Sequence, residues 1–262
     1  MDYFARFLMS TRPPGDDIYE LLVTGVDSIG VLNKITAILA KGNVNFVSSH
    51  GQMDEAGKLF TNAFFCEMAK AKVTPDELKK ELEALPFVKD VRLESMKGRM
   101  HEANMFPLST FFAGRVLVLG AAAFSQIEAR LVEIFGSAGE VMAYEQGRAY
   151  SLATLADMEG YRKKVGATWD VGNIADWVRA QGWAAAEITE TAEGYHVKLS
   201  SVPTHKGDEE SGGVSRFLTG MMVGMLETPA GQRLAAGPTV YDQATKSYSF
   251  KVIRQPGSSR PK

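Results

Sequence analysis

Cysteine, surplus positive charge and long apolar runs are all scarce in this chain of 262 residues. A single cysteine, Cys66, excludes an internal disulfide framework and a cysteine-rich zinc site. Lys and Arg (29) nearly balance Asp and Glu (31), so we expect no direct nucleic-acid partner, which normally requires a basic face. No apolar run reaches the ~18 residues that a membrane helix needs. The start Met-Asp-Tyr-Phe lacks signal-peptide regions. These absences favour a cytoplasmic protein without a membrane partner.

Motifs of catalysis and metal binding are also missing from the sequence. No nucleophile elbow, phosphate loop or dinucleotide fingerprint is present. Cys66 alternates with Phe64 and Met68, a pattern typical of a small buried hydrophobe. The four histidines lack metal-ligand spacing; they are His50, His101, His196 and His205. We therefore expect no enzyme activity, no catalytic residue, no metal and no cofactor.

What is present is the composition of a globular protein, 45% hydrophobic and 23% charged, and a clear pattern in residues 16–96. Apolar residues recur at helical spacing after Gly30, and Thr74-Pro75-Asp76-Glu77 is a capping box that begins a second helix. The predicted order is strand, helix, strand, strand, helix, strand, an α+β arrangement of the ferredoxin-like type. The predicted elements are Tyr19–Thr24, Val31–Lys41, Asn45–Met53, Lys58–Met68, a helix after Thr74, and Val88–Leu93.

The pattern changes beyond a predicted linker at residues 97–106. Phe124, Ile127, Leu131, Ile134 and Phe135 form one stripe of a helix that ends near Gly136. The other predicted elements are a strand Arg115–Leu119, helices Glu140–Leu152, one around Ile174 and Val214–Leu226, a hairpin of Ala184–Thr189 with Tyr195–Ser200, and strands near Thr239–Tyr241 and Ser247–Ile253.

Together these patterns give five segments. Residues 1–15 are an N-terminal extension, 16–96 and 107–254 are two α/β domains joined by 97–106, and 255–262 are a tail rich in Pro, Gly and Ser that we expect to be disordered.

The first domain resembles the ACT family, whose members are small regulatory modules that commonly bind amino acids between paired subunits. The resemblance is carried by Val23-Thr24-Gly25-Val26-Asp27-Ser28-Ile29-Gly30-Val31-Leu32 and by Gly42-Asn43-Val44-Asn45-Phe46. Ile29 replaces the proline usual before the helix-opening glycine. The resemblance implies an effector site lined by Asp27, Gly30, Val31 and Asn45, and the free N–H groups of a helix start suit a carboxylate. The alternative is that Asp27 and Asn45 cap turns and Gly30 forms a tight bend.

The second domain resembles the 4-vinyl-reductase type, a small-molecule-binding module of hydrocarbon and phenol sensors and tetrapyrrole-pathway proteins. The resemblance is carried by Tyr144–Arg148, Ser215–Gly224 and the closing strand around Phe250. Members of that family that bind zinc do so through cysteines near the glycine-rich helix and in the final strands. This chain has Ser215 and Tyr248 near the corresponding positions. A zinc function is therefore not expected.

An apolar pocket without metal is compatible with that second domain. The candidate ligand-pocket residues are Glu145, Arg148, Trp177, Trp183, Tyr195, His196, Phe217 and Met221, with Glu145, Arg148 and His196 as polar anchors. The alternative is that the aromatic and methionine side chains fill a core, while Glu145 and Arg148 form a surface ion pair.

Three hypotheses of function follow. The first is a non-catalytic sensor or regulatory protein with an amino-acid-type effector in one domain and an apolar or aromatic ligand in the other. The second is a structural or assembly subunit of an enzyme complex, with degenerate pockets and a protein partner. The third, which rests only on the family name, is an enzyme or carrier of tetrapyrrole or aromatic metabolism. We also expect a homodimer, because ACT units commonly cover their sheet edges by pairing.

Overall fold

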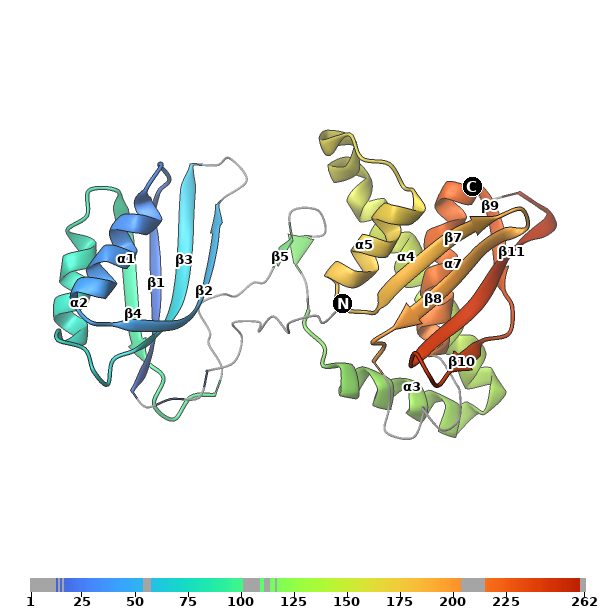
Figure 1. Cartoon of the computed structure of the whole chain (residues 1–262), viewed down its shortest axis with the longest axis horizontal. Coiled ribbons are helices and arrows are strands. Elements are labelled where there is room, and N and C mark those ends of the chain that lie inside the picture. Colours follow the sequence, from blue (N-terminus) through green and yellow to red (C-terminus); the bar gives the residue numbers. More distant parts are fainter. Residues whose placement is uncertain are drawn as a thin grey trace. The chain divides into compact units, whose positions relative to one another are not determined.

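The computed structural model describes residues 13, 15, 17–53, 58–100, 109–110, 114–115, 117–203 and 215–259. At residues 109–110, 114–115 and 256–259 only the backbone is described. The chain divides into two compact units, Met1–Leu108 and Ser109–Lys262, which are treated separately below (Figure 1). Within the described residues, no helix is both long and apolar enough to cross a membrane.

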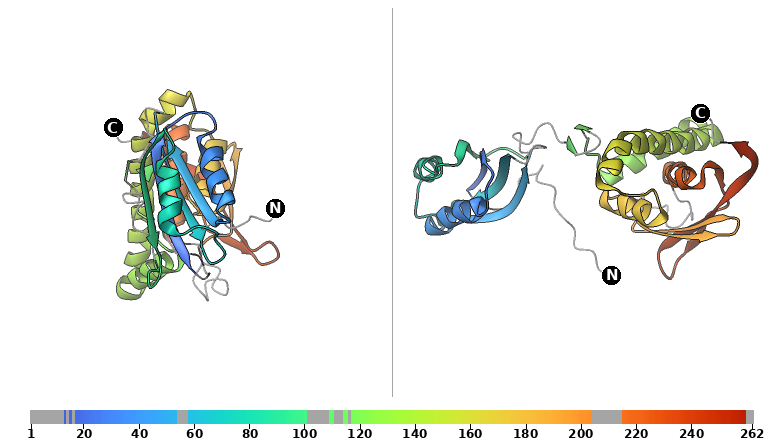
Figure 2. Two further views of the ribbon diagram at one scale, coloured as in Figure 1. Left: turned by 90° about the vertical axis from the view of Figure 1, so that its left-hand side faces the viewer. Right: turned by 90° about the horizontal axis from the view of Figure 1, so that it is seen from above.

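Unit 1 has the predicted ferredoxin-like element order. A four-stranded antiparallel sheet of order β2-β3-β1-β4 carries α1 and α2 on one face (Figure 2). The capping box at Thr74 and Glu77 is present, with both reciprocal hydrogen bonds made. The elements are β1 (Ile18–Val26), α1 (Val31–Lys41), β2 (Asn45–Met53), β3 (Leu59–Glu67), α2 (Pro75–Glu83) and β4 (Val88–Ser95).

The core of unit 1 lies between the sheet and the two helices. Alternate strand residues such as Leu21 and Phe64 meet Ile35 and Leu78 from the helices, and all four are buried. Cys66 belongs to the same core, as its alternation with Phe64 predicts. Desolvation in this apolar interior raises the pKa of its thiol to about 12. Cys66 is therefore an uncharged core residue at neutral pH.

Unit 2 is a mixed α/β structure in which α7 lies between the long helix α4 and an antiparallel sheet (Figure 2). The sheet has the order β10-β11-β8-β7, and β9 also pairs with β11. The elements are β5 (Ser109–Thr110), β6 (Gly114–Arg115), α3 (Ala121–Phe135), α4 (Ser137–Val165), α5 (Val171–Ala180), β7 (Ala185–Thr191), β8 (Gly194–Ser200), α7 (Arg216–Ala230), β9 (Gln232–Ala236), β10 (Val240–Asp242) and β11 (Ser247–Ser259).

Burial between two layers explains the composition of α7. Every residue from Leu218 to Glu227 is buried, so this helix is apolar all round rather than amphipathic. Its glycines allow the close approach of α4. A Cβ on Gly220 would overlap the carbonyl oxygen of Tyr144, and one on Gly147 would overlap that of Phe217. The two helix backbones are therefore in direct contact.

Several sequence expectations for unit 2 are wrong. Residues 117–120 lie outside any strand, although Arg115–Leu119 was expected to be one. The helix expected over Glu140–Leu152 continues to Val165, and β9 was not foreseen. The backbone from Gln255 to Ser259 belongs to β11, where Ser259 pairs with Gln232, so the expected disordered tail begins inside a strand. Pairing with β9 supplies the backbone partners that the tail composition did not reveal.

Much of the apolar stripe of α3 lies at the surface of unit 2. The helix ends at Phe135, as expected, but Ile127, Ile134 and Phe135 are more than half exposed. Ser125, on the opposite side of the helix, is the residue of α3 that is buried. The apolar stripe through Ile127 and Ile134 therefore faces away from the core of unit 2.

Candidate ligand-binding sites

The turn that leads into α1 is fixed by backbone hydrogen bonds from both neighbouring strands. The Val26 N–H donates to the carbonyl of Phe87 (2.8 Å), and the Asp27 N–H donates to that of Lys58 (2.9 Å). Gly30 then takes a left-handed conformation with φ 89°, which glycine adopts without steric cost. The chain therefore turns sharply into α1, and the first turn of the helix lies at the end of the inner strand β1.

The N-terminus of α1 carries no side-chain cap in the described part of the chain. The helices α2, α5 and α7 differ, because Thr74, Asp170 and Ser215 accept hydrogen bonds from their first turns. A Cβ on Gly30 would meet no atom within 4 Å, and its neighbour Ile29 is fully exposed. This opening is called the α1 mouth below. Uncapped N–H groups with the positive end of the helix dipole suit a carboxylate or another small anion.

The four predicted effector residues are not all gathered at the α1 mouth. Asp27 and Gly30 lie there, while the Val31 side chain is buried in the core (6% exposed) and the Val31 N–H donates to the Ser28 carbonyl at 3.2 Å. Asn45 of β2 lies opposite Glu67, the last residue of β3. Val26 of β1, just before the α1 mouth, lies opposite Leu59, the first residue of β3. Eight residues of β3 span about 26 Å at ~3.3 Å each. Within one copy of unit 1, Asn45 and the α1 mouth lie at opposite ends of the sheet.

The predicted pocket of unit 2 is largely filled by its own side chains. Tyr195 and Met221 are buried in the core between α7 and the sheet. His196 follows Tyr195 on β8, is exposed on the other face of the sheet, and lies across from Thr189 and Lys251. Burial raises the pKa of Tyr195, since desolvation disfavours the phenolate. These residues do not surround an enclosed ligand cavity.

Arg148 is engaged in a structural ion pair. Its guanidinium donates to both carboxylate oxygens of Glu227 on α7 at 3.0 Å, and Glu227 also accepts from the Leu234 N–H at 3.1 Å. Desolvation acts to lower the pKa of Arg148, but the bonds to Glu227 outweigh it and the net pKa is raised. Glu145 is exposed and lies 3.7 Å from Arg148. The predicted anchor Arg148 therefore joins α4 to α7 and β9.

The structure does bring three predicted residues together in a cluster of aromatic rings. The Trp183 and Phe217 rings stack with centroids 5.5 Å apart, and Trp177 reaches the cluster through Tyr150. Phe124 of α3 meets both Trp183 (5.2 Å) and Phe217 (4.9 Å) edge-on. We call these five residues, Phe124, Tyr150, Trp177, Trp183 and Phe217, the aromatic cluster. Sequence reasoning missed Tyr150 as a site residue and placed Phe124 only in a helix stripe, because nothing in a linear pattern shows that α3, α4, α5 and α7 converge.

One polar atom in the aromatic cluster lacks a partner. The Trp177 side chain is 7% exposed, and its indole Nε1–H makes no hydrogen bond within the described part of the chain. A buried donor without an acceptor costs about 1–3 kcal/mol. Tyr150 is 37% exposed, so the cluster reaches the surface. An aromatic ligand with an oxygen acceptor could stack against these rings and accept a hydrogen bond from the indole N–H.

Comparisons with known proteins give partial likenesses. No family model matches the chain, and no curated protein is similar to it. Among solved structures, a formyltetrahydrofolate deformylase from Pseudomonas syringae pv. tomato is 18% identical with a TM-score of 0.29, over 31% of this chain and 28% of that one. The ACT domain from GTP pyrophosphokinase of Chlorobium tepidum is 20% identical with a TM-score of 0.25, over 30% of this chain and 99% of that one. A protein of unknown function from Galdieria sulphuraria is 20% identical with a TM-score of 0.26, over 30% of this chain and 44% of that one. The solved structures that this chain resembles thus include ACT domains, on about a third of its length.

Proposed function

We propose that this protein is a non-catalytic regulatory protein that binds an amino-acid-type effector at the α1 mouth of unit 1. The observation that carries the proposal is the start of α1, where Gly30 leaves open space and no side chain of the described residues caps the helix. The first turn holds no acidic residue, and Lys34 adds positive charge there, stacked over the Phe87 ring at 5.4 Å. An α-carboxylate satisfies both the N–H groups and that charge.

The test is a titration of the full chain with each protein amino acid, followed by calorimetry and thermal unfolding. A ligand at one hundred times its Kd stabilises the native state by about 2.7 kcal/mol, which raises Tm by several degrees. The amide of the same amino acid lacks the carboxylate and serves as the ligand control. Absence of any heat or Tm change at 10 mM across the panel would contradict the proposal.

A matched pair of variants locates the site. Gly30→Asn and Gly30→Asp have nearly the same shape, and both residue types tolerate a left-handed backbone better than others do. The aspartate adds a carboxylate that competes with the effector at the helix start. We expect Gly30→Asp to weaken binding at least tenfold more than Gly30→Asn does. Unchanged affinity in both variants would show that the effector binds without using the helix mouth.

We further propose that the aromatic cluster of unit 2 binds a phenol-sized aromatic ligand. The Nε1–H of Trp177, which has no acceptor among the described residues, supports this. Trp177→Phe is the test, because it keeps a flat ring and removes the donor. We expect the variant to lose affinity for phenol and benzoate, measured by tryptophan fluorescence, while its own stability stays constant or rises. Unchanged affinity would remove the cluster from consideration as a binding site.

The filled core of unit 2 favours one alternative, a structural or assembly subunit of an enzyme complex. Ten consecutive buried residues of α7 leave the predicted pocket members Tyr195 and Met221 packed on all sides. Under this alternative neither titration gives a signal, and the chain copurifies in fixed ratio with one enzyme. The two proposals therefore predict opposite results in the same pair of experiments.

A further inference from the structure

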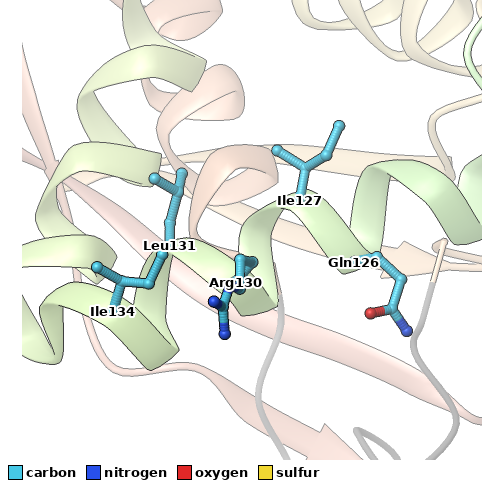
Figure 3. Close-up of a pocket in the computed structure, with 5 residues that line it drawn as sticks. All are labelled: Gln126, Ile127, Arg130, Leu131 and Ile134. Atoms are coloured by element: carbon cyan, nitrogen blue, oxygen red, sulfur yellow. The ribbon is translucent and has the colours of Figure 1, made fainter.

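The outer face of α3 carries an apolar stripe, and its Ile127 and Ile134 side chains are 54% and 55% exposed. Ile127, Leu131 and Ile134 lie along one side of the helix, with Gln126 and Arg130 beside them (Figure 3). These five residues line a hollow of about 490 Å³. The apolar side chains stand at helical spacing along this face, which suits them to interdigitate with side chains of a facing helix.

The exposed apolar surface extends beyond the stripe. Leu117 is 85% exposed, and Val118 and Leu119, which lead into α3, are 59% and 56% exposed. An exposed apolar patch with a polar rim often marks an interaction site. We define the α3 surface as the half-buried Leu131 and the exposed residues Leu117, Val118, Leu119, Ile127, Ile134 and Phe135.

The size of the α3 surface matches a small protein interface. Burying one large apolar side chain removes on the order of 100 Å² from water. With its members about half exposed, the α3 surface offers roughly 400 Å² of apolar area per copy. Homodimer interfaces are about 65% apolar, so the whole contact amounts to about 600 Å² per copy. Two copies then bury about 1,200 Å², the lower limit of stable interfaces.

The arrangement of side chains favours a second copy as the occupant. A two-fold contact requires a patch that is complementary to itself. The stripe meets this requirement, because an isoleucine lies one helical turn away on each side of Leu131, at Ile127 and Ile134. Its edge carries both signs of charge, with Arg130 and Glu133 paired at 2.7 Å. A helix that lies on a membrane surface is instead rich in Lys and Arg. The third charge of α3, Glu128, is turned inward to the start of α7, where it accepts from the Ser215 hydroxyl.

We propose that the α3 surface is a homodimer interface, in which α3 packs antiparallel against α3 of a second copy about a two-fold axis close to Leu131. This places the dimer contact in unit 2, whereas the sequence pattern led us to expect pairing through unit 1. The proposal is independent of the ligands proposed above.

Sedimentation equilibrium of the full chain between 1 and 100 µM is the first test. We expect the wild type to be a dimer. We expect the double variant Ile127→Glu/Ile134→Glu to have a dimer dissociation constant at least one hundredfold higher. Val240→Glu is the control, because Val240 lies in β10 of the same unit and is 62% exposed. Both changes are at exposed positions, so circular dichroism and Tm should remain close to wild type. A wild-type monomer at 100 µM, or a dimer that the double variant leaves intact, would overturn the proposal.

Cysteine cross-linking is the second test, and it reports on the axis itself. A residue can form a disulfide with its own copy only near the two-fold axis. The native Cys66 is buried and will not compete. We expect Leu131→Cys to give a covalent dimer on mild oxidation and Val240→Cys to stay monomeric. Cross-linking through Val240→Cys alone, or flotation of a monomeric chain with anionic phospholipid vesicles, would refute the α3 interface.

Discussion

Gly220 of α7 lies directly against the backbone of Tyr144 in α4, so close that any Cβ at position 220 would overlap the Tyr144 carbonyl oxygen. Gly147 of α4 stands in the same relation to Phe217. The glycines that the sequence shows in these two helices are thus contact points between backbones. The close approach also allows the Ser151 hydroxyl to donate to the Met221 carbonyl at 2.7 Å.

Gly220→Ala is expected to destabilise the protein by about 2–4 kcal/mol, because the added methyl must push α4 and α7 apart in a packed core. Gly160→Ala is the matched control, since Gly160 lies in α4 and a Cβ there meets nothing within 4 Å. The control should gain up to about 1 kcal/mol from the better helix propensity of alanine. Chemical denaturation of both variants measures the difference. Equal stabilities would mean that the two helices are not in backbone contact.

Arg148→Met is expected to cost about 3 kcal/mol, because it leaves the buried Glu227 carboxylate without its main partner. The second variant, Arg148→Met/Glu227→Gln, removes the unpaired charge and keeps an acceptor for the Leu234 N–H. We expect it to recover about half of the loss, as a double-mutant cycle in urea would show. A double variant less stable than Arg148→Met would contradict this account of the pair.

Glu128→Ala is expected to lose about 1–2 kcal/mol, because the Glu128 carboxylate accepts from the Ser215 hydroxyl and from the first N–H groups of α7. Together with the Phe124–Phe217 ring pair, this contact joins α3 to the start of α7. Glu133→Ala provides the comparison, since Glu133 is exposed on the same helix and paired only with Arg130 in the described structure. That variant should change stability by less than about 0.5 kcal/mol. Similar losses in thermal unfolding would exclude a capping role for Glu128.

Cys66 is expected to make stability depend on alkaline pH. Its pKa rises from 9.0 to about 12 on folding, so between these values the folded chain holds a proton that the unfolded chain has lost. Unfolding free energy from this group therefore falls as pH rises through that window, by about 1 kcal/mol between pH 9 and 10. Comparing urea unfolding of the wild type with that of Cys66→Ala at pH 8 and pH 10 isolates the effect. A wild type and variant with parallel pH dependence would refute it.

The sequence alone determined unit 1 and much of the secondary structure of unit 2. Alternating residues such as Phe64 and Cys66 mark a half-buried strand, and the Thr74–Glu77 capping box marks a helix start; both signals are local and survive in the fold. The glycine that opens α1 was also visible, but whether Asp27 caps the turn there was left open by the sequence and decided by the structure, in which no side chain of the described residues caps α1.

Only the tertiary structure decided which surfaces meet. It directed the Ile127–Ile134 stripe outward, paired Arg148 with Glu227, drew Phe124 and Tyr150 to Trp183, and separated Asn45 from the α1 mouth. Helical spacing states that a face is apolar but not what covers it, and the partners of these residues lie up to 79 positions away in the chain. Contacts between distant segments depend on how whole helices and sheets pack, and no local pattern encodes that packing.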